Sequence, residues 1–146
     1  TVTKRRLILD CLTSGANSRT IQRERVVLPR ITDVINDVLA CMLHIGEGHY
    51  IKQLALDFTD AFWKIPLNPA ERRWFVAEHR GRFLVWRRVA QGSVNGPQAW
   101  GRISALVTRL VQSMFTEGEL ELQTYTDDPI ATLTGTEQYI RRNLAI

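Results

Sequence analysis

The sequence predicts an α+β protein, built from an antiparallel sheet with helices packed on one of its faces. Short segments rich in β-branched and aromatic residues alternate with longer segments whose apolar residues recur at helical spacing. Their order is strand, helix, strand, hairpin, helix, hairpin and helix, which suits a sheet covered by helices. The chain has 146 residues, of which 45% are hydrophobic and 23% charged, as in an ordinary globular domain.

The first third of the chain predicts a strand followed by a helix. Residues 4–12 are rich in Leu and Ile and favour a strand, and residues 14–18 form a turn. Pro29 opens a helix at the position where its missing N–H costs nothing, and Gly46 and Gly48 end it. The apolar residues of this helix share one face: Ile31, Val34, Ile35, Val38, Leu39 and Met42.

The middle of the chain predicts a buried strand, a hairpin and a second long helix. Residues 50–58 form the strand, with the apolar stretch 54–56 at its buried part. Residues 74–77 and 83–86 flank a glycine-containing loop and predict a hairpin. After the loop at residues 91–96, Pro97 opens the helix. Its apolar stripe consists of Trp100, Ile103, Val107, Leu110, Val111 and Met114.

The last part of the chain predicts a second hairpin and a final helix. Glu117 and Gly118 turn the chain, and residues 119–126 and 130–133 are strands joined at 127–129. Residues 134–136 then start the helix. No apolar run approaches the roughly 18 residues of a membrane span, so no membrane partner is expected. There is no initiator Met and no signal peptide, so the chain is expected to be an excerpt of a longer one.

Charge and cysteine usage bound the setting of the protein. Cys11 and Cys41 make no metal-binding spacing and are expected to be reduced, which favours an intracellular location, either a cytoplasmic particle or the nucleus. The net charge is +4 and the pI about 9.5, which permits an anionic partner. Arginines occur in pairs along the chain, each of which alone suits a solvated surface. The four tryptophans are expected to pack in the core rather than stack on bases.

Acidic residues stand at the ends of two predicted strands. Asp57 follows the strand at 50–58, and Asp127 and Asp128 follow Tyr125 and Thr126. Carboxylates beside buried apolar strands are costly unless paired, hydrogen-bonded or bound to a cation. Three carboxylates brought together repel one another, and a divalent ion with oxygen ligands would offset that repulsion. Mg²⁺ typically binds one or two protein carboxylates together with substrate phosphates. The arrangement predicts phosphoryl transfer, although singly each site also fits an ordinary turn or strand-end cap.

A glycine-bearing loop leads into the N-terminus of the second long helix. It runs from Gln91 and Gly92 to Gly96 and Pro97. Backbone N–H groups and the helix dipole favour an anion there, or the close approach of a nucleotide. Alone, this pattern also fits a plain joint between a loop and a helix.

Together these segments resemble motifs A, B and C of reverse transcriptases. They are 57–62 (DFTDAF), 91–97 (QGSVNGP) and 125–128 (YTDD), in the family's order and at similar separations. Upstream, residues 6–10 and 28–31 resemble a fingers strand and the segment that opens the next helix. The resemblance implies a polymerase palm, a ferredoxin-like antiparallel sheet with helices on one face, plus part of the fingers. Residues 1–49 would be partial fingers and a connecting helix, and residues 50–146 the palm. The thumb and any ribonuclease H domain would be absent.

The resemblance implies a set of metal ligands and a set of substrate contacts. Asp57 and Asp127 would hold two Mg²⁺ ions, for which Mn²⁺ substitutes, with Asp128 as the supporting carboxylate. The remaining family positions fall into two groups. The deoxynucleoside triphosphate side comprises Arg6, Asp60, Ala61, Phe62, Gln91 and Gly92, and the template and primer side comprises Gly96, Pro97 and Tyr125.

The predicted function is that of an RNA-directed DNA polymerase from a retroelement polyprotein. It would extend a primer on an RNA or DNA template by a two-metal mechanism. Phe62 stands where the family places an aromatic ring beneath the sugar, and such a ring clashes with a 2′-hydroxyl. Two departures, Gly96 for Ser and Val89-Ala90 for Leu-Pro, bear on how the template is held. The alternatives are a non-catalytic or inactive remnant that binds nucleic acid and, against Phe62, an RNA-directed RNA polymerase.

Overall fold

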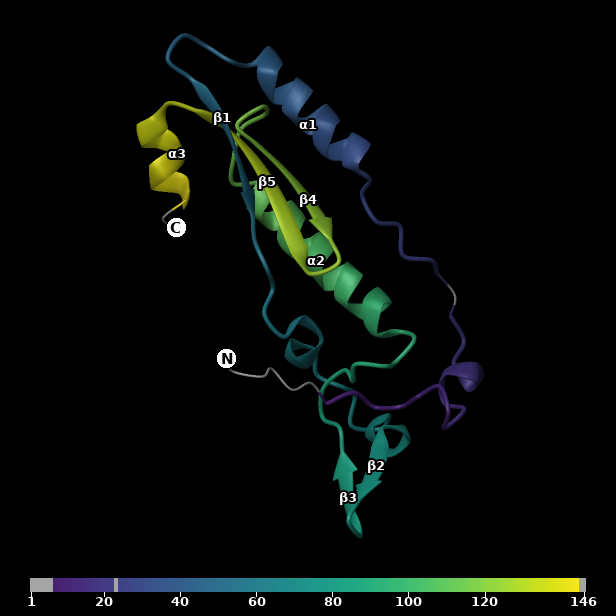
Figure 1. The fold of residues 1–146 in the computed structure, drawn as a ribbon. Coiled ribbons are helices and arrows are strands. Elements are labelled where there is room, and N and C mark those ends of the chain that lie inside the picture. The colour runs from purple at the N-terminus through teal and green to yellow at the C-terminus, as the bar shows by residue number, and fades with distance from the viewer. Residues whose placement is uncertain (1–6, 23, 145–146) are drawn as a thin grey trace, which may run out of the picture. The chain divides into compact units, whose positions relative to one another are not determined.

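A computed structural model describes residues 7–22 and 24–144, as a mixed α+β chain with three α-helices and an antiparallel sheet (Figure 1). It divides into two compact units. Unit 1 comprises Thr1–Val26 and Asp60–Gly101, and unit 2 comprises Val27–Thr59 and Arg102–Ile146. None of the described helices is both long and apolar enough to cross a membrane. The predicted division into residues 1–49 and 50–146 stays a prediction.

Unit 2 is built on a three-stranded antiparallel sheet in the order β1-β5-β4 (Figure 1). The strands are β1 (Tyr50–Ala55), β4 (Leu120–Tyr125) and β5 (Asp128–Gly135). β5 is the central strand, pairing Tyr50 with Gly135 on one side and Leu120 with Leu133 on the other. The predicted strand at 50–58 is therefore confirmed for Tyr50–Ala55 and ends three residues earlier than predicted, and the predicted second hairpin is confirmed. The stretch 54–56 is not buried, however, since Leu56 is 49% exposed.

One face of this sheet carries the apolar core of unit 2. Leu120, Ala131 and Leu133 are buried there against Ile140 of α3 (Glu137–Leu144), which is fully buried. Several partly buried residues pack against this cluster, including two near the C-terminal end of α2 (Gly96–Gln112). They are Leu54, Val111, Phe115 and Leu122. The strand residues of this core lie on one face of the sheet because side chains two positions apart along a strand point the same way.

The opposite face of the sheet is polar and is covered by α1 (Ile31–Leu43). Gln123 donates a hydrogen bond from Nε2 to Oδ1 of Asp37, at 3.3 Å, and Thr132 and Thr134 of the central strand are buried. Cys41 of α1 has no exposed surface, and burial raises the pKa of its thiol. Helices thus cover both faces of the sheet, and the predicted arrangement on one face is wrong.

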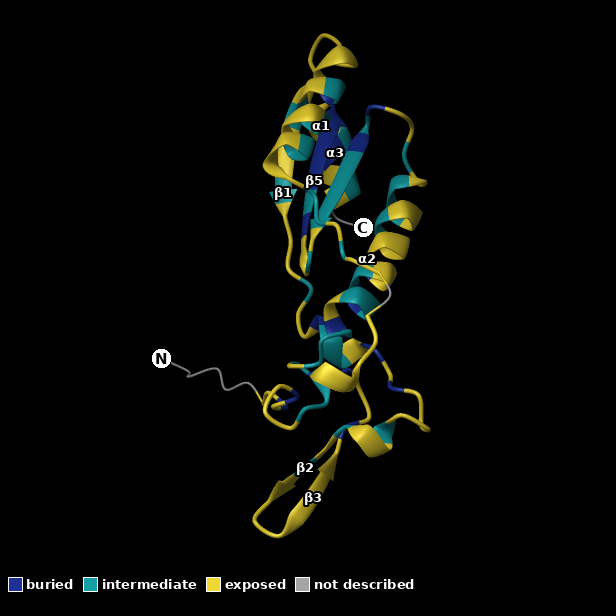
Figure 2. Ribbon diagram, turned by 90° about the vertical axis from the view of Figure 1, so that its right-hand side faces the viewer, coloured by how far each residue is buried: buried dark blue, intermediate teal, exposed yellow. Residues whose placement is uncertain are grey.

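Helix α1 begins and faces differently from the prediction. It starts at Ile31, where the Asp33 carboxylate accepts the N–H of Arg30, so Pro29 lies before the cap rather than in the first turn. Its predicted apolar face is largely exposed, with Ile35 at 51% and Leu39 at 53% (Figure 2). The face turned to the sheet carries Asp37 and Cys41, and of the predicted stripe only Val34 and Val38 are half-buried. Periodicity located the helix but not its buried side.

Unit 1 holds a two-stranded hairpin, β2 (Val76–His79) and β3 (Arg82–Val85), as predicted. The two-residue turn is Arg80-Gly81, and both residues have positive φ, 51° and 71°. Positive φ at both central positions defines the type I′ turn that matches the twist of paired strands. Every residue of the two strands except Ala77 is exposed (Figure 2).

The core of unit 1 gathers around the chain entering and leaving this hairpin. Its buried members are Leu9, Cys11, Ala61, Ile65, Leu67, Trp86, Val89, Ala90 and Trp100. The expected core packing of tryptophan holds for Trp86 and Trp100, whereas Trp74 is 68% exposed. The predicted strand at 4–12 is wrong for residues 7–12, which form an irregular segment and a turn, and residues 4–6 lie outside the described residues.

Candidate active site

The Tyr125–Asp128 segment forms the tight turn between β4 and β5. Tyr125 pairs with Asp128, so the two turn residues are Thr126 and Asp127 rather than the predicted 127–129. Thr126 has φ of 54°, whereas Asp127 does not have a positive φ. Positive φ at the first central residue alone is the pattern of a type II′ turn, in which glycine is usual and a β-branched residue is strained. The turn thus holds two adjacent carboxylates on a constrained backbone.

The β1–β5 ladder continues beyond the end of β1 and brings Asp57 to this turn. The N–H of Leu56 donates to the carbonyl of Pro129 at 2.9 Å, and the N–H of Phe58 donates to the carbonyl of Asp127 at 2.8 Å. These bonds keep the register of the strand, in which Ala55 lies opposite Ile130. Asp57 therefore lies directly across from Asp128. Opposed residues on antiparallel strands have Cβ atoms about 4.5–5.5 Å apart, close enough for like charges to repel.

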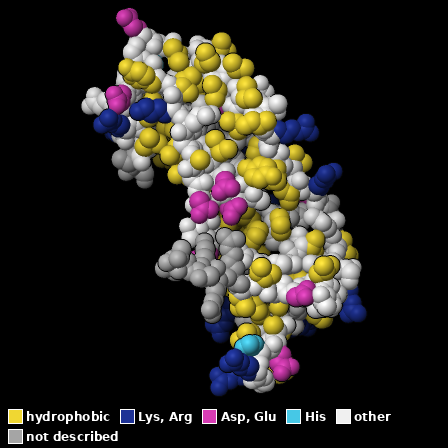
Figure 3. Space-filling view, viewed as in Figure 1, with side chains coloured by type: hydrophobic (Ala, Val, Ile, Leu, Met, Phe, Trp, Pro, Cys, Tyr) yellow, Lys and Arg dark blue, Asp and Glu magenta, His cyan; other side chains and the backbone are white. Residues whose placement is uncertain are grey.

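All three carboxylates are exposed to solvent, unlike the buried strand ends that the sequence predicted. Figure 3 shows acidic side chains gathered at the end of the sheet where the β4–β5 turn lies. No three His, Cys, Asp or Glu side chains form a ready metal-binding group within residues 7–22 and 24–144. Because these carboxylates face water, burial does not force them to bind a cation, and only mutual repulsion between them would favour one.

In unit 1, the glycine-bearing loop is packed against the segment around Leu9. The N–H of Leu9 donates to the carbonyl of Gln91 at 2.9 Å. Gly92 has φ of 107°, and a Cβ added there would lie 2.1 Å from the Leu9 carbonyl oxygen. The absence of a side chain at Gly92 is therefore required by the chain's own backbone, whatever else approaches the loop.

Asn17 connects the turn at residues 14–18 to the same loop. Its Nδ2 donates to the carbonyl of Gly92, and its Oδ1 accepts the N–H of Val94, both at 3.0 Å. Both polar atoms of one side chain thus fix the loop backbone. Sequence reasoning missed this residue because its partners lie 75 and 77 positions away and nothing local distinguishes it from an ordinary turn Asn.

The other predicted substrate residues of unit 1 lie on two segments. Asp60 has φ of 56° and precedes the 3-10 helix Ala61–Lys64, in which Ala61 is buried and Phe62 half-buried. A methyl group on Gly96 would come within 4.0 Å of Phe62 Cε1. Gly96 is buried and starts α2, one residue earlier than predicted, and Pro97 is exposed beside it. The structure thus brings Phe62 close to the end of the loop. Arg6 lies outside the described residues.

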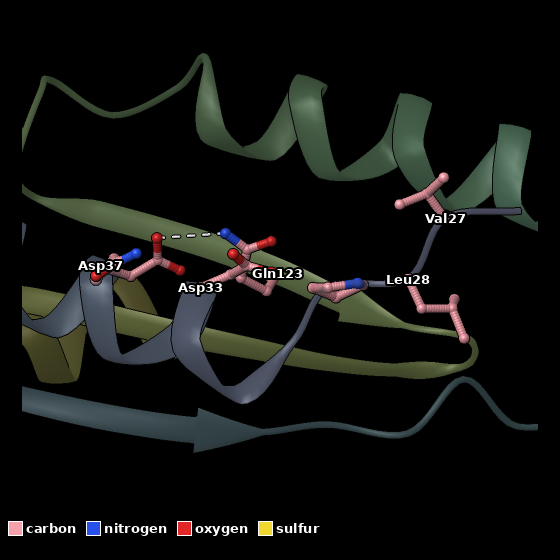
Figure 4. A pocket seen from close by; sticks show the side chains of 7 residues that line it. Val27, Leu28, Asp33, Asp37 and Gln123 are labelled. Atoms are coloured by element: carbon pink, nitrogen blue, oxygen red, sulfur yellow. Dashed lines mark hydrogen bonds between the residues drawn. The ribbon is translucent and has the colours of Figure 1, made fainter.

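A shallow pocket of about 400 Å³ lies in unit 2 between α1 and β4, and none of the predicted site residues lines it (Figure 4). Its polar lining is Asp33, Asn36, Asp37 and Gln123, with Val27, Leu28 and Pro29 as the apolar part. Farther along β4, burial and, second, the charge of Asp37 raise the pKa of Glu121, whose carboxylate accepts a hydrogen bond from Gln112 Nε2 at 2.8 Å. The Gln123–Asp37 bond thus joins β4 to α1, and the Gln112–Glu121 bond joins β4 to α2.

Comparison with known proteins finds a likeness to solved structures, among them two of a foamy virus protein. No family model and no curated protein matches the chain. The CSH mutant of the prototype foamy virus protease-reverse transcriptase, labelled with selenomethionine, aligns with a TM-score of 0.49 at 23% identity. The native form of that protein aligns with a TM-score of 0.47 at 22% identity. In both cases 64% of this chain is covered, and it spans only 11% of the foamy virus chain.

Proposed function

We propose that this chain carries the catalytic carboxylates and part of the nucleotide-binding surface of a reverse transcriptase, an RNA-directed DNA polymerase of retroelement type. The hydrogen bond from the Phe58 N–H to the Asp127 carbonyl is the observation that carries the proposal. It joins two segments that are far apart in the sequence and aligns Asp57 with the Asp127-Asp128 turn. One carboxylate that follows a strand and two in a tight turn then lie at the same end of the sheet.

The carboxylate ligands at this end of the sheet suit magnesium. Asp57, Asp127 and Asp128 offer only hard oxygen ligands, and their exposure leaves room for the waters that Mg²⁺ retains. When bound, a pair of such ions would lower the pKa of a primer 3′-hydroxyl and neutralise charge on the triphosphate and the leaving pyrophosphate. Asp57 and Asp127 would be the main ligands and Asp128 the supporting one. Mn²⁺ takes similar oxygen ligands and would substitute.

The residues of unit 1 supply substrate contacts in this proposal. Gln91 and Gly92 would border the nucleotide, with Asp60, Ala61 and Arg6 near its phosphates. Gly96 and Pro97 would contact template and primer, and so would Tyr125. The Phe62 ring would lie beneath the sugar and offer a 2′-hydroxyl a clash instead of a hydrogen bond, which selects deoxynucleotides.

The test of this function is primer extension on an RNA template by the 146-residue chain, with Mg²⁺ and then Mn²⁺. Extension with deoxynucleotides is expected, and Asp57→Asn and Asp127→Asn are expected to abolish it. Glu47→Gln removes the same charge from an exposed residue elsewhere and should leave extension unchanged. Ribonucleotide incorporation equal to that of deoxynucleotides would support an RNA-directed RNA polymerase instead.

A second readout tests the metal site without relying on turnover. Mn²⁺ is paramagnetic, and its binding should broaden the backbone amide signals of Phe58 and Asp128 before those of other residues. Asp127→Asn should remove this broadening. A chain that shows neither broadening at these residues nor extension would be a non-catalytic remnant, and the proposed function would be rejected.

A further inference from the structure

Positive charge is clustered around the β2–β3 hairpin. Residues 71–88 hold six arginines and two glutamates, a balance of +4 that equals the net charge of the entire chain. Figure 3 shows basic side chains gathered at the end of this hairpin, beside a histidine. A field from clustered charge attracts a polyanion far better than the same charge spread over the surface.

These arginines are not neutralised inside the protein. Within the part of the chain that the structure describes, Arg80, Arg82 and Arg87 form no ion pair, and all three side chains are exposed. Arg88 donates to the carbonyl of Lys64 at 3.2 Å, which leaves its charge unmatched. Exposed guanidinium groups suit phosphate as a partner, because their N–H donors match its oxygens in geometry and charge.

Large exposed aromatic side chains lie among these arginines. Phe83 is 75% exposed on β3, and Trp74 is 68% exposed just before β2. The Arg73 guanidinium lies over the Trp74 ring, 4.9 Å from its centroid. Val76 and Val85, which pair across the hairpin and share a face with Phe83, are exposed as well. An exposed patch of this kind on a hairpin marks an interaction surface rather than a core.

We propose that the β2–β3 hairpin, together with Arg73 and Trp74, binds a single-stranded nucleic acid. Exposed aromatics offer stacking platforms to unpaired bases, and the arginines beside them contact the backbone phosphates. A duplex offers the charge partner but keeps its bases stacked and out of reach of the rings. The inference extends the proposed function by naming the surface that holds an unpaired strand. It rests on the proposed function only for the identity of that strand.

Fluorescence anisotropy with a labelled oligo-dT of about 12 nucleotides tests this surface. The titration is done with EDTA and without nucleotides, so that it requires no active site. The double variant Trp74→Ala/Phe83→Ala should weaken binding about tenfold or more, because removing one stack of a base on a ring costs about 1–3 kcal/mol. The pair Leu106→Ala/Leu110→Ala removes exposed apolar side chains from α2 and should leave the affinity unchanged.

The arginines are tested by the salt dependence of the same binding. Arg80→Gln/Arg82→Gln should flatten the slope of log K against log salt by about 0.7 for each phosphate that the variant no longer neutralises. Arg109→Gln/Arg142→Gln, which removes the same charge from exposed residues of α2 and α3, should leave the slope nearer that of the wild type. Thermal unfolding of each variant confirms that it is folded.

The outcomes separate this surface from the carboxylate site. Asp127→Asn should bind oligo-dT normally, and the hairpin variants should keep the Mn²⁺ broadening at Phe58. Equal affinity for duplex, equal weakening in the hairpin and control variants, or no binding by the wild type would overturn the proposal. Binding to anionic vesicles or to an acidic peptide, without binding to oligo-dT, would assign the hairpin to a different partner and overturn it too.

Discussion

Asn17 holds the backbone of Gly92 through a side-chain hydrogen bond of 3.0 Å from Nδ2 to the Gly92 carbonyl. The other end of the same amide accepts the Val94 N–H. A turn near the N-terminus is in this way tied to the loop that leads into α2. The conformation of this loop therefore depends on Asn17, which lies outside all the segments predicted to form the active site.

Asn17→Ala is expected to release this loop. It removes both bonds and leaves the half-buried Val94 N–H without its acceptor, so the free energy of unfolding should fall by about 1–3 kcal/mol. Hydrogen exchange at the Val94 amide should become faster. Asn68→Ala, which removes a bond only to its near neighbour Ala70, is the control. Unchanged exchange at Val94 would show that the side chain does not fix the loop.

Gly92→Ala is expected to be severely destabilising. Positive φ alone costs a non-glycine residue about 1–3 kcal/mol, and here the added Cβ also meets the Leu9 carbonyl oxygen at 2.1 Å. Gly81→Ala is the matched control, because φ there is 71° but nothing lies within 4 Å of the added Cβ. Urea unfolding should rank Gly92→Ala well below Gly81→Ala. Equal destabilisation would mean that backbone strain, not the close approach, sets the requirement for glycine.

Glu121 should make the stability of the protein depend on pH. Burial raises the pKa of its carboxyl above the ordinary value of 4.5, with Asp37 as the second cause. The folded protein therefore holds this proton more tightly than the unfolded chain does. The stabilising contribution is complete below about pH 4.5 and is lost as the pH rises through the folded pKa.

Glu121→Gln should remove the loss of stability that accompanies ionisation of Glu121. The variant should therefore gain stability relative to wild type as the pH rises from about 4 to about 7. Urea unfolding at the two pH values measures the gain, and Glu47→Gln serves as a control with the same change in charge. In an NMR titration, Asp37→Asn should lower the pKa of Glu121 without returning it fully, since burial is the larger cause. A gain independent of pH would contradict this account.

Ile140→Ala tests whether α3 closes the apolar core of unit 2. The side chain is fully buried against Leu120 and Leu133, and its truncation should cost about 2–5 kcal/mol. Leu144 on the same helix is 44% exposed, so Leu144→Ala should cost much less. Chemical unfolding of the two variants compares them directly. Similar small effects would show that α3 contributes little to the core.

Sequence patterns predicted most of the elements but not the sides on which they pack. The two hairpins, β2–β3 and β4–β5, follow from local turn chemistry and could be predicted. The apolar stripe of α1 located the helix, yet Asp37 and Cys41 face the sheet. Periodicity shows that a helix has two faces, and only the neighbouring sheet face selects which one is covered.

By itself, the sequence determined that acidic residues follow one strand and occupy the turn between two others. Strand ends and turns depend on local residue types, so a local pattern is enough to predict them. Only the tertiary structure decided that Asp57 lies across from Asp128, since register between distant strands is set by long-range pairing. It also decided that these carboxylates are exposed and that Gly92 must accommodate Leu9. Burial and close approach are properties of the packed chain, and no local pattern encodes them.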